Sequence, residues 1–252
     1  MKEENMYQGK TVLITGGAGG IGQACVLEFL KSGAKVLIVD FDEYAVEKCI
    51  AQFSNDNHIF GYAFDLNKVR DIPNFISQIS QEHHHIDILV QAAGMMSSRS
   101  ALDVEVDEFE KIMKINVEGM FFMMQEVVKQ FMFDNGGSIL NFASEAAIRG
   151  FTGSMAGVHY SASKGAVIAM SRQLAVEWGQ YQIRVNSICP GGVLTSTMEK
   201  MSFDEDFQII PLKRLSTPKD IAKTVAYLCS DGASMITGQN IVVDGGCAAV
   251  GC

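Results

Sequence analysis

The sequence has few prolines, an excess of negative charge and no long apolar run. Its 252 residues include four prolines, and 29 Asp and Glu outweigh 20 Lys and Arg to give a formal net charge of -9. Nucleic-acid binding needs a clustered basic surface, which this balance does not indicate. A membrane span needs roughly 18 consecutive apolar residues, and no stretch is that long. We therefore expect a protein that binds neither nucleic acid nor membrane.

Cysteine and histidine show no pairing or metal-binding pattern. The six cysteines are scattered without a C-x-x-C motif, which is typical of reduced thiols, so a disulfide between Cys247 and Cys252 is not expected. The first ten residues, MKEENMYQGK, lack the apolar segment of a signal peptide, and we predict a cytoplasmic protein. The adjacent histidines 83–85 cannot all face one ion, so we interpret them as a solvated turn and predict no metal site.

What the sequence does contain is a regular alternation of short apolar runs and longer amphipathic segments. The expected strands are 11–15, 34–40, 58–64, 86–91, 137–143, 183–189 and 240–244. The expected helices are 20–32, 42–54, 67–82, 107–132, 157–179 and 218–229. Buried strands separated by helices predict the α/β class, as a single doubly wound Rossmann domain whose seven-stranded parallel sheet carries helices on both faces. We assign residues 1–252 to this domain, with an N-terminal tail at 1–8.

A glycine-rich turn follows the first expected strand. It reads TGGAGGIGQA and places Gly16, Gly20 and Gly22 where the strand gives way to a helix. Glycine lets the backbone approach a pyrophosphate, whose charge then lies at the helix N-terminus. Such a motif is informative in a strand–turn–helix context, which this one has. The turn predicts dinucleotide binding.

Acidic residues end the next two strands. Asp40, in VLIVDFDE, can accept hydrogen bonds from both ribose hydroxyls of an adenosine and would repel a 2′-phosphate, so we predict NAD rather than NADP. The alternative is that Asp40 caps the following helix, although Asp42 is better placed for that. Asp65 ends the third strand, where it can bond the adenine amino group or cap the next helix.

The stretch HYSASKGAV places a tyrosine four residues before a lysine. On a helix, Tyr160 and Lys164 then lie on the same face. A tyrosine with a pKa of about 10 is a poor base at neutral pH, but a nearby cation favours the phenolate. We therefore expect Lys164 to lower the pKa of Tyr160, which becomes a general acid/base for an alcohol oxygen.

These motifs together resemble the short-chain dehydrogenase/reductase family over about residues 8 to 247. TGGAGGIG resembles its cofactor turn, YSASK its catalytic pair, KINVEG its asparagine motif, NFAS its serine and CPGGVLT its nicotinamide segment. The implied catalytic residues are Asn116, Ser144, Tyr160 and Lys164. The implied cofactor-binding residues are Gly16, Gly20, Ile21, Gly22, Asp40, Asp65, Leu66, Ala92, Ala93, Gly94, Tyr160, Lys164, Pro190, Gly191, Val193 and Thr195.

The resemblance also implies the role of each catalytic side chain. Ser144 would hydrogen-bond the substrate oxygen, and Tyr160 would transfer the proton. Lys164 would hold the nicotinamide ribose, and Asn116 would hold a water that links Lys164 to solvent. Val193 and Thr195 would orient the nicotinamide. The implied reaction is NAD-dependent interconversion of a secondary alcohol and a ketone.

The chain departs from the family pattern in two places. The usual N-N-A-G after the fourth strand is QAAG here, which leaves the contacts of the missing asparagine open. Ser144 precedes Tyr160 by sixteen residues, so the segment between them holds an insertion. Ser154 is a rival for the serine role, but it lies in the middle of that insertion. The glycine spacing also matches sugar-nucleotide epimerases, although the 62 residues after Pro190 are too few for their substrate domain.

Residues 118–133, EGMFFMMQEVVKQFMF, carry apolar side chains on every side of an expected helix. Either the helix is buried in its own domain, or one face meets a second subunit. Flanking helices normally keep a polar face, so we favour a homo-oligomer, a tetramer before a dimer.

The substrate is the least determined part of the prediction. We expect residues 196–215 to form a mobile lid, and Arg149 is either an anion-binding or a surface residue. An apolar pocket would favour a hydrophobic or cyclic alcohol; its candidate residues are Met95, Met96, Arg149, Phe151, Met155, Leu194 and Met198. His159 is left open. The alternatives are an NADPH-type 3-oxoacyl or sugar reductase and a non-catalytic NAD-binding sensor.

Overall fold

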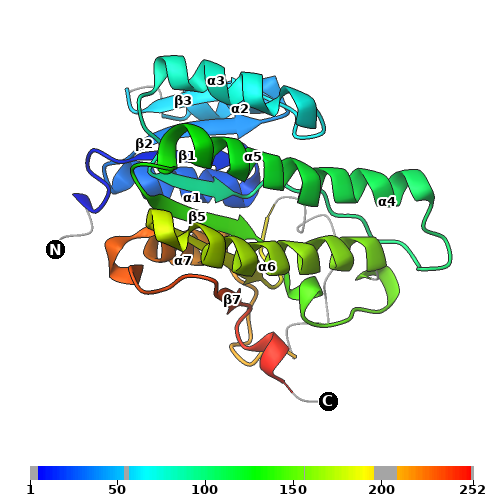
Figure 1. Ribbon diagram of the computed structural model, residues 1–252. Helices are drawn as coiled ribbons and strands as arrows, with labels where there is room; N and C mark the ends of the chain where they lie inside the picture. The colour runs from blue at the N-terminus through cyan, green and yellow to red at the C-terminus, as the bar shows by residue number, and fades with distance from the viewer. Residues whose placement is uncertain (1–4, 54–56, 156, 196–208, 251–252) are drawn as a thin grey trace.

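The computed structural model describes residues 5–53, 57–155, 157–195 and 209–250. Seven parallel strands form one sheet in the order β3-β2-β1-β4-β5-β6-β7 (Figure 1), which confirms the predicted fold class. The strands are β1 (Thr11–Thr15), β2 (Lys35–Asp40), β3 (Ile59–Ala63), β4 (Ile88–Gln91), β5 (Gly137–Phe142), β6 (Ile183–Pro190) and β7 (Asn240–Val243). The order reverses between β1 and β4, and we call the region at their carboxyl ends, where sheets of this kind bind ligands, the crevice.

Helices cover both faces of the sheet because alternate strand residues point to opposite sides. Leu13 belongs to the core formed with α3 (Ile72–Glu82), α5 (Met120–Val127) and α6 (Val158–Trp178). Val12 and Ile14 belong to the second core, formed with α1 (Gly20–Lys31), α2 (Glu43–Ala51) and α7 (Pro218–Cys229). Figure 1 shows α5 and α6 on one side of the sheet and α1 and α7 on the other.

The segment predicted as a helix from residue 67 begins later. Val69–Asp71 forms a 3₁₀ turn, and α3 starts at Ile72 with a proline in its first turn. Proline is favoured there because the first-turn N–H groups have no partner inside the helix. Asp65 does not cap α3; its carboxylate accepts hydrogen bonds from the backbone and the side-chain amide of Asn67, at 2.9 and 3.1 Å.

The apolar helix between residues 106 and 132 is helical throughout but not uniformly α-helical. It consists of α4 (Val106–Met113), a π-helical segment at Lys114–Gly119, α5, and a second π-helical segment at Val128–Met132. Its methionines 120, 123 and 124 are buried in the core of this chain. Burial within one protomer therefore explains most of the apolar pattern that we read as a subunit contact.

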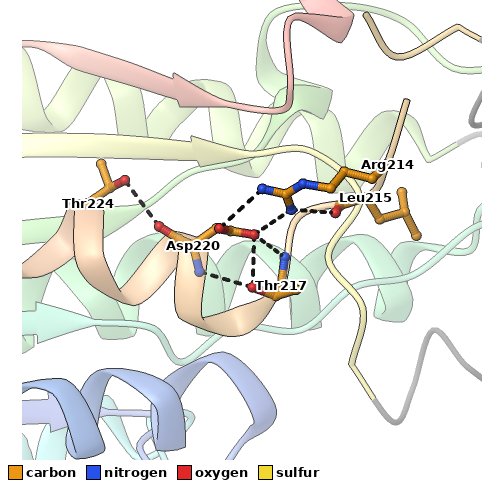
Figure 2. Close-up of polar contacts among 5 residues, drawn as sticks. All are labelled: Arg214, Leu215, Thr217, Asp220 and Thr224. Carbon is orange, nitrogen blue, oxygen red and sulfur yellow. Dashed lines mark hydrogen bonds and ion pairs between the residues drawn. The ribbon is translucent and has the colours of Figure 1, made fainter. Parts of the chain in front are cut away.

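Polar contacts anchor the start of α7, as Figure 2 shows. The Thr217 hydroxyl accepts a hydrogen bond from the Asp220 N–H, and the Asp220 carboxylate accepts one from the Thr217 N–H, which forms a capping box. Arg214 donates to the same carboxylate at 2.7 Å. These bonds, and burial of Leu215, fix the C-terminal end of the predicted lid. The rest of that lid, 196–208, lies outside the described residues.

The histidine run differs from the predicted solvated turn at one position. His83 is buried, and one of its ring nitrogens lies 2.7 Å from the hydroxyl of Tyr62. Burial lowers the pKa of His83. Over the described ranges, no three His, Cys, Asp or Glu side chains are placed to hold a metal ion. None of the described helices is long and apolar enough to cross a membrane.

Candidate active site

The glycine-rich turn lies at the crevice between β1 and β4. Gly16 has a φ of +68°, and a Cβ atom there would lie 2.5 Å from the backbone nitrogen of Ala93. A Cβ atom on Gly22 would lie 2.0 Å from the carbonyl oxygen of Gly16. Neither position accepts a side chain without moving backbone, so the turn presents bare N–H groups at the start of α1. A Cβ atom on Gly20 would lie 3.2 Å from Thr195, so the segment predicted to bind the nicotinamide lies beside the turn.

Asp40 braces this turn from the end of β2. Its carboxylate accepts hydrogen bonds from the N–H of Ala18 at 3.2 Å and of Phe41 at 2.8 Å. Asp42 caps α2 by accepting from the N–H of Ala45 at 3.0 Å, as predicted. Asp40 therefore has no capping role, and its carboxylate stays at the mouth of the crevice.

Three of the predicted catalytic residues meet at the end of β5. Ser144 follows the strand and accepts a hydrogen bond from the N–H of Ala146 at 3.2 Å. Its side chain also lies close enough to Tyr160 to lower the pKa of the phenol. Lys164 is 4% exposed, and its Nζ donates to the carbonyl of Phe142 at 2.6 Å. The Lys164 ammonium lies 5.9 Å from the centre of the Tyr160 ring.

The electrostatics of the pair differ from the sequence prediction. Burial raises the pKa of Tyr160, and the group that lowers it is Ser144 rather than Lys164. Burial also lowers the pKa of Lys164 to about 8. The prediction that Lys164 lowers the tyrosine pKa is therefore wrong for this structure, because the ammonium is engaged with Phe142 and both groups are desolvated.

Asn116 is buried and tied to the loop after β4. Its amide exchanges two hydrogen bonds of 2.8 Å with the backbone of Met95 and donates to Ser163 at 3.1 Å. A Cβ atom on Gly94 would lie 3.2 Å from Lys164 Nζ and 3.3 Å from Asn116 Oδ1, so Gly94 separates the two side chains. Asn116 lies in the first π-helical segment, a feature often found at functional sites.

The QAAG turn keeps its shape without the family's asparagine. The N–H of Ala92 donates to the carbonyl of Thr15 at 3.0 Å. Gln91 turns into the core, where its amide donates to Met120 O at 3.1 Å and to Asn141 Oδ1 at 3.2 Å. The backbone of the turn therefore remains available on the crevice side.

The remaining predicted cofactor residues surround the same edge of the sheet. The Gly191 N–H donates to Val243 O at 3.1 Å, which fixes the turn after Pro190. Val193 pairs with Ser216 through an isolated bridge and is buried. Ile21, in the first turn of α1, packs against one core, and Leu66 is buried in the other core, which includes α3.

The insertion holds an ion pair that no sequence pattern signals. Glu145, directly after Ser144, is 5% exposed and pairs with Arg149, whose guanidinium stacks on the Phe151 ring at 4.6 Å. Burial raises the pKa of Glu145, and Arg149 opposes the shift. Arg149 is therefore neither a free anion-binding residue nor an unpaired surface arginine. The thiol of Cys247, which is not disulfide-bonded, lies near Glu145, and burial and this carboxylate raise its pKa.

The structure tests the candidate pocket residues in part. Met96 and Leu194 are 50% and 44% exposed, while Met95, Phe151 and Met155 are half-buried. Met198 and the side chain of Ser154 lie outside the described residues. The described candidates are apolar apart from the neutralised Arg149.

The crevice fits a dinucleotide. A backbone cradle that Cβ atoms would fill lies at the start of a helix, where a pyrophosphate is stabilised. A carboxylate lies at the end of β2, and a buried lysine and a tyrosine lie beyond the end of β5. These groups match the donors and acceptors that a dinucleotide presents.

Comparisons with known proteins also indicate dinucleotide binding. A family described as "Enoyl-(Acyl carrier protein) reductase" matches residues 16–248. An NAD-dependent glycerol dehydrogenase of Listeria innocua is 34% identical over 94% of this chain and 93% of its own length. A D-threitol dehydrogenase of Mycolicibacterium smegmatis is 35% identical over 94% and 92%. The crystal structure of a Brucella melitensis 3-ketoacyl-(acyl-carrier-protein) reductase with NADH superposes with a TM-score of 0.88 at 32% identity, covering 96% and 99%.

Proposed function

Since this chain belongs to the short-chain dehydrogenase/reductase family and is an oxidoreductase of CH–OH groups, we propose that it interconverts a secondary alcohol and a ketone with NAD. The observation that carries the proposal is the contact between Ser144 and Tyr160 beside the buried Lys164. A protein that merely binds NAD needs no acid/base pair at that place. This argues against a non-catalytic sensor.

Each residue of the site has a distinct task in this reaction. A bound NAD would supply the hydride acceptor for the carbinol carbon. Tyr160 Oη takes the hydroxyl proton, while Ser144 Oγ holds the substrate oxygen. Lys164 would hold the ribose of the cofactor and places its positive charge 5.9 Å from the Tyr160 ring. Asn116 holds the Met95 backbone and thereby the loop beside the site.

We favour an uncharged substrate. The guanidinium of Arg149 is already paired with Glu145, so the described side chains offer no free cation for a carboxylate or phosphate there. The relatives named for glycerol and D-threitol support a small polyol, whereas the half-exposed Met96 and Leu194 favour a more apolar or cyclic alcohol. The alternative is a 3-oxoacyl reductase, which the Brucella melitensis structure keeps open.

The experiment that tests the proposal is a panel of polyols, cyclic alcohols, hydroxysteroids and 3-hydroxyacyl thioesters. Purified protein is assayed with NAD and with NADP, and cofactor reduction is followed by its absorbance. Turnover of a secondary alcohol with NAD supports the proposal. Tight NAD binding without turnover of any compound favours the sensor, and turnover with NADP alone favours the biosynthetic reductase.

Replacement of Asp40 with Asn should weaken the preference for NAD. The substitution keeps an acceptor for the Ala18 N–H but removes the negative charge that repels a 2′-phosphate. We expect the ratio of kcat/KM for NAD to that for NADP to fall about tenfold or more, equivalent to about 1.4 kcal/mol. Asp42→Asn is the matched control, since it removes the same charge two residues away. Equal ratios for both variants would show that Asp40 does not select the cofactor.

We also propose a cytoplasmic homo-oligomer. On the described surface, Leu102, Val106, Phe109 and Val158 are exposed apolar side chains around the start of α4 and α6. Such patches are uncommon on monomers and mark contact surfaces. Light scattering at micromolar concentration should give the mass of a tetramer, and a stable 27.4 kDa species would contradict this.

A further inference from the structure

A polar cluster lies beside the catalytic helix but outside the machinery described above. We call Ser97, Arg99, Glu108 and His159 the Glu108 cluster. Its members come from the loop after β4, from the first turn of α4 and from the first turn of α6. His159 directly precedes Tyr160, so the cluster is connected to the acid/base residue by a single peptide bond.

The Glu108 carboxylate is the centre of the cluster. One oxygen accepts a hydrogen bond from Ser97 Oγ and lies 3.4 Å from His159 Nε2. The other lies 2.6 Å from Arg99 Nε. Ser97, Arg99 and His159 all lower the pKa of Glu108, so the carboxylate is charged at neutral pH.

Burial of the His159 side chain destabilises the fold unless its ring interacts with a neighbouring group. Its side chain is 0% exposed, and neither ring nitrogen has a hydrogen-bond partner in the described structure. A buried polar group without such a partner destabilises a fold. The Glu108 carboxylate is the charged group that its ring faces. This pair joins α4 to α6 at the turn that carries Tyr160.

Backbone packing makes the connection stiff. Arg99 and Gly157 form an isolated parallel bridge, and a Cβ atom on Gly157 would lie 2.6 Å from Ser97 O. The loop after β4 therefore lies directly against the residue before α6. A shift of Glu108 would move this loop and the first turn of α6 together.

We propose that Glu108 is a positioning residue, which acts through His159 and the loop at 97–99 to hold Tyr160 against Ser144 and beside Lys164. The inference rests on the proposed function, in which Tyr160 transfers the proton. Misplacement of a reacting group by about 1 Å can lower a rate about 10²-fold. Loss of the Glu108 charge should therefore act on turnover rather than on cofactor binding.

The test compares Glu108→Gln with Asp107→Asn. Both variants remove a carboxylate from the first turn of α4, so the change in helix-dipole energy is shared, but Asp107 is exposed and lies outside the cluster. We expect Glu108→Gln to lower kcat about tenfold with the Kd for NAD within about twofold, and Asp107→Asn to leave both unchanged. A kcat of Glu108→Gln equal to that of Asp107→Asn would overturn the inference.

A double-mutant cycle of Glu108→Gln with His159→Phe tests whether Glu108 acts through His159. If Glu108 acts through His159, the double variant should lose no more kcat than the worse single variant. Free-energy losses that add would show independent roles and overturn the inference.

Hydrogen exchange separates this inference from the proposed function because it needs no turnover. The peptide 157–164 should exchange faster in Glu108→Gln than in Asp107→Asn. Unchanged exchange overturns the positioning role even in an active enzyme. Faster exchange in a protein that oxidises no alcohol supports the positioning role and contradicts the proposed reaction instead.

Discussion

Replacement of Tyr160 with Phe should abolish turnover while NAD binding stays within about twofold of the wild type. The substitution removes one oxygen and keeps the ring, whose packing on α6 is unchanged. That oxygen is the atom that takes the hydroxyl proton, and general acid/base catalysis contributes about 10²- to 10⁴-fold. We expect kcat to fall by about that factor. Cofactor affinity, measured by calorimetry, should not fall together with kcat.

A control variant makes this test specific to Tyr160. Tyr227→Phe, at a half-exposed position on α7 away from the site, removes the same atom and should retain full activity. Activity of Tyr160→Phe within tenfold of the wild type would mean that another group transfers the proton. Ser144→Ala should then be examined, because Ser144 is the hydroxyl that contacts Tyr160.

Much of the fold was predictable because its signals are local and strong. The seven strands lie within two residues of their predicted ends, since each is a short apolar run ended by turn residues. The glycine turn was predictable because a positive φ at Gly16 and the close approach of Gly22 each require glycine. The helix that starts at Ile72 rather than 67 shows the limit, because helix ends depend on turn geometry that periodicity does not contain.

The parts that could not be predicted are contacts between distant segments. Nothing in the residues around Asn116 signals a π-helical segment, nor that its amide would hold the Met95 backbone. Glu108 and His159 are 51 positions apart, and no pattern predicts that their side chains meet. The direction of the Tyr160 pKa shift was wrong for the same reason: helical spacing places Lys164 near, but burial and the Phe142 carbonyl decide its electrostatics.

Replacement of Lys164 with Met should abolish turnover and also change how stability depends on pH. Met has a similar length but no charge and cannot donate to Phe142 O. In contrast to Tyr160→Phe, this variant should lose NAD affinity as well, since Lys164 is proposed to hold the ribose. Activity loss of about 10²- to 10⁴-fold with weaker NAD binding is the expected pair of results.

The pH effect follows from the buried ammonium. Burial lowers the Lys164 pKa from its ordinary 10.5 to about 8. Between these values the unfolded chain binds more protons than the folded chain at this residue, so Lys164 makes stability rise with pH in that window. The difference of 2.5 pKa units corresponds to roughly 3 kcal/mol.

The measurement is therefore a difference between variants. Groups that titrate in both proteins cancel when the unfolding free energy of Lys164→Met is compared with the wild type at pH 8 and at pH 10.5. The variant's stability relative to the wild type should fall by up to about 3 kcal/mol between these values, because the wild type alone gains from deprotonation of the lysine.

Lys223→Met, on the exposed side of α7, removes a charge without a burial cost and should show no such change. A constant difference for Lys164→Met would mean that the lysine is solvated in the folded protein, and the charge that the mechanism needs beside Tyr160 would then be screened.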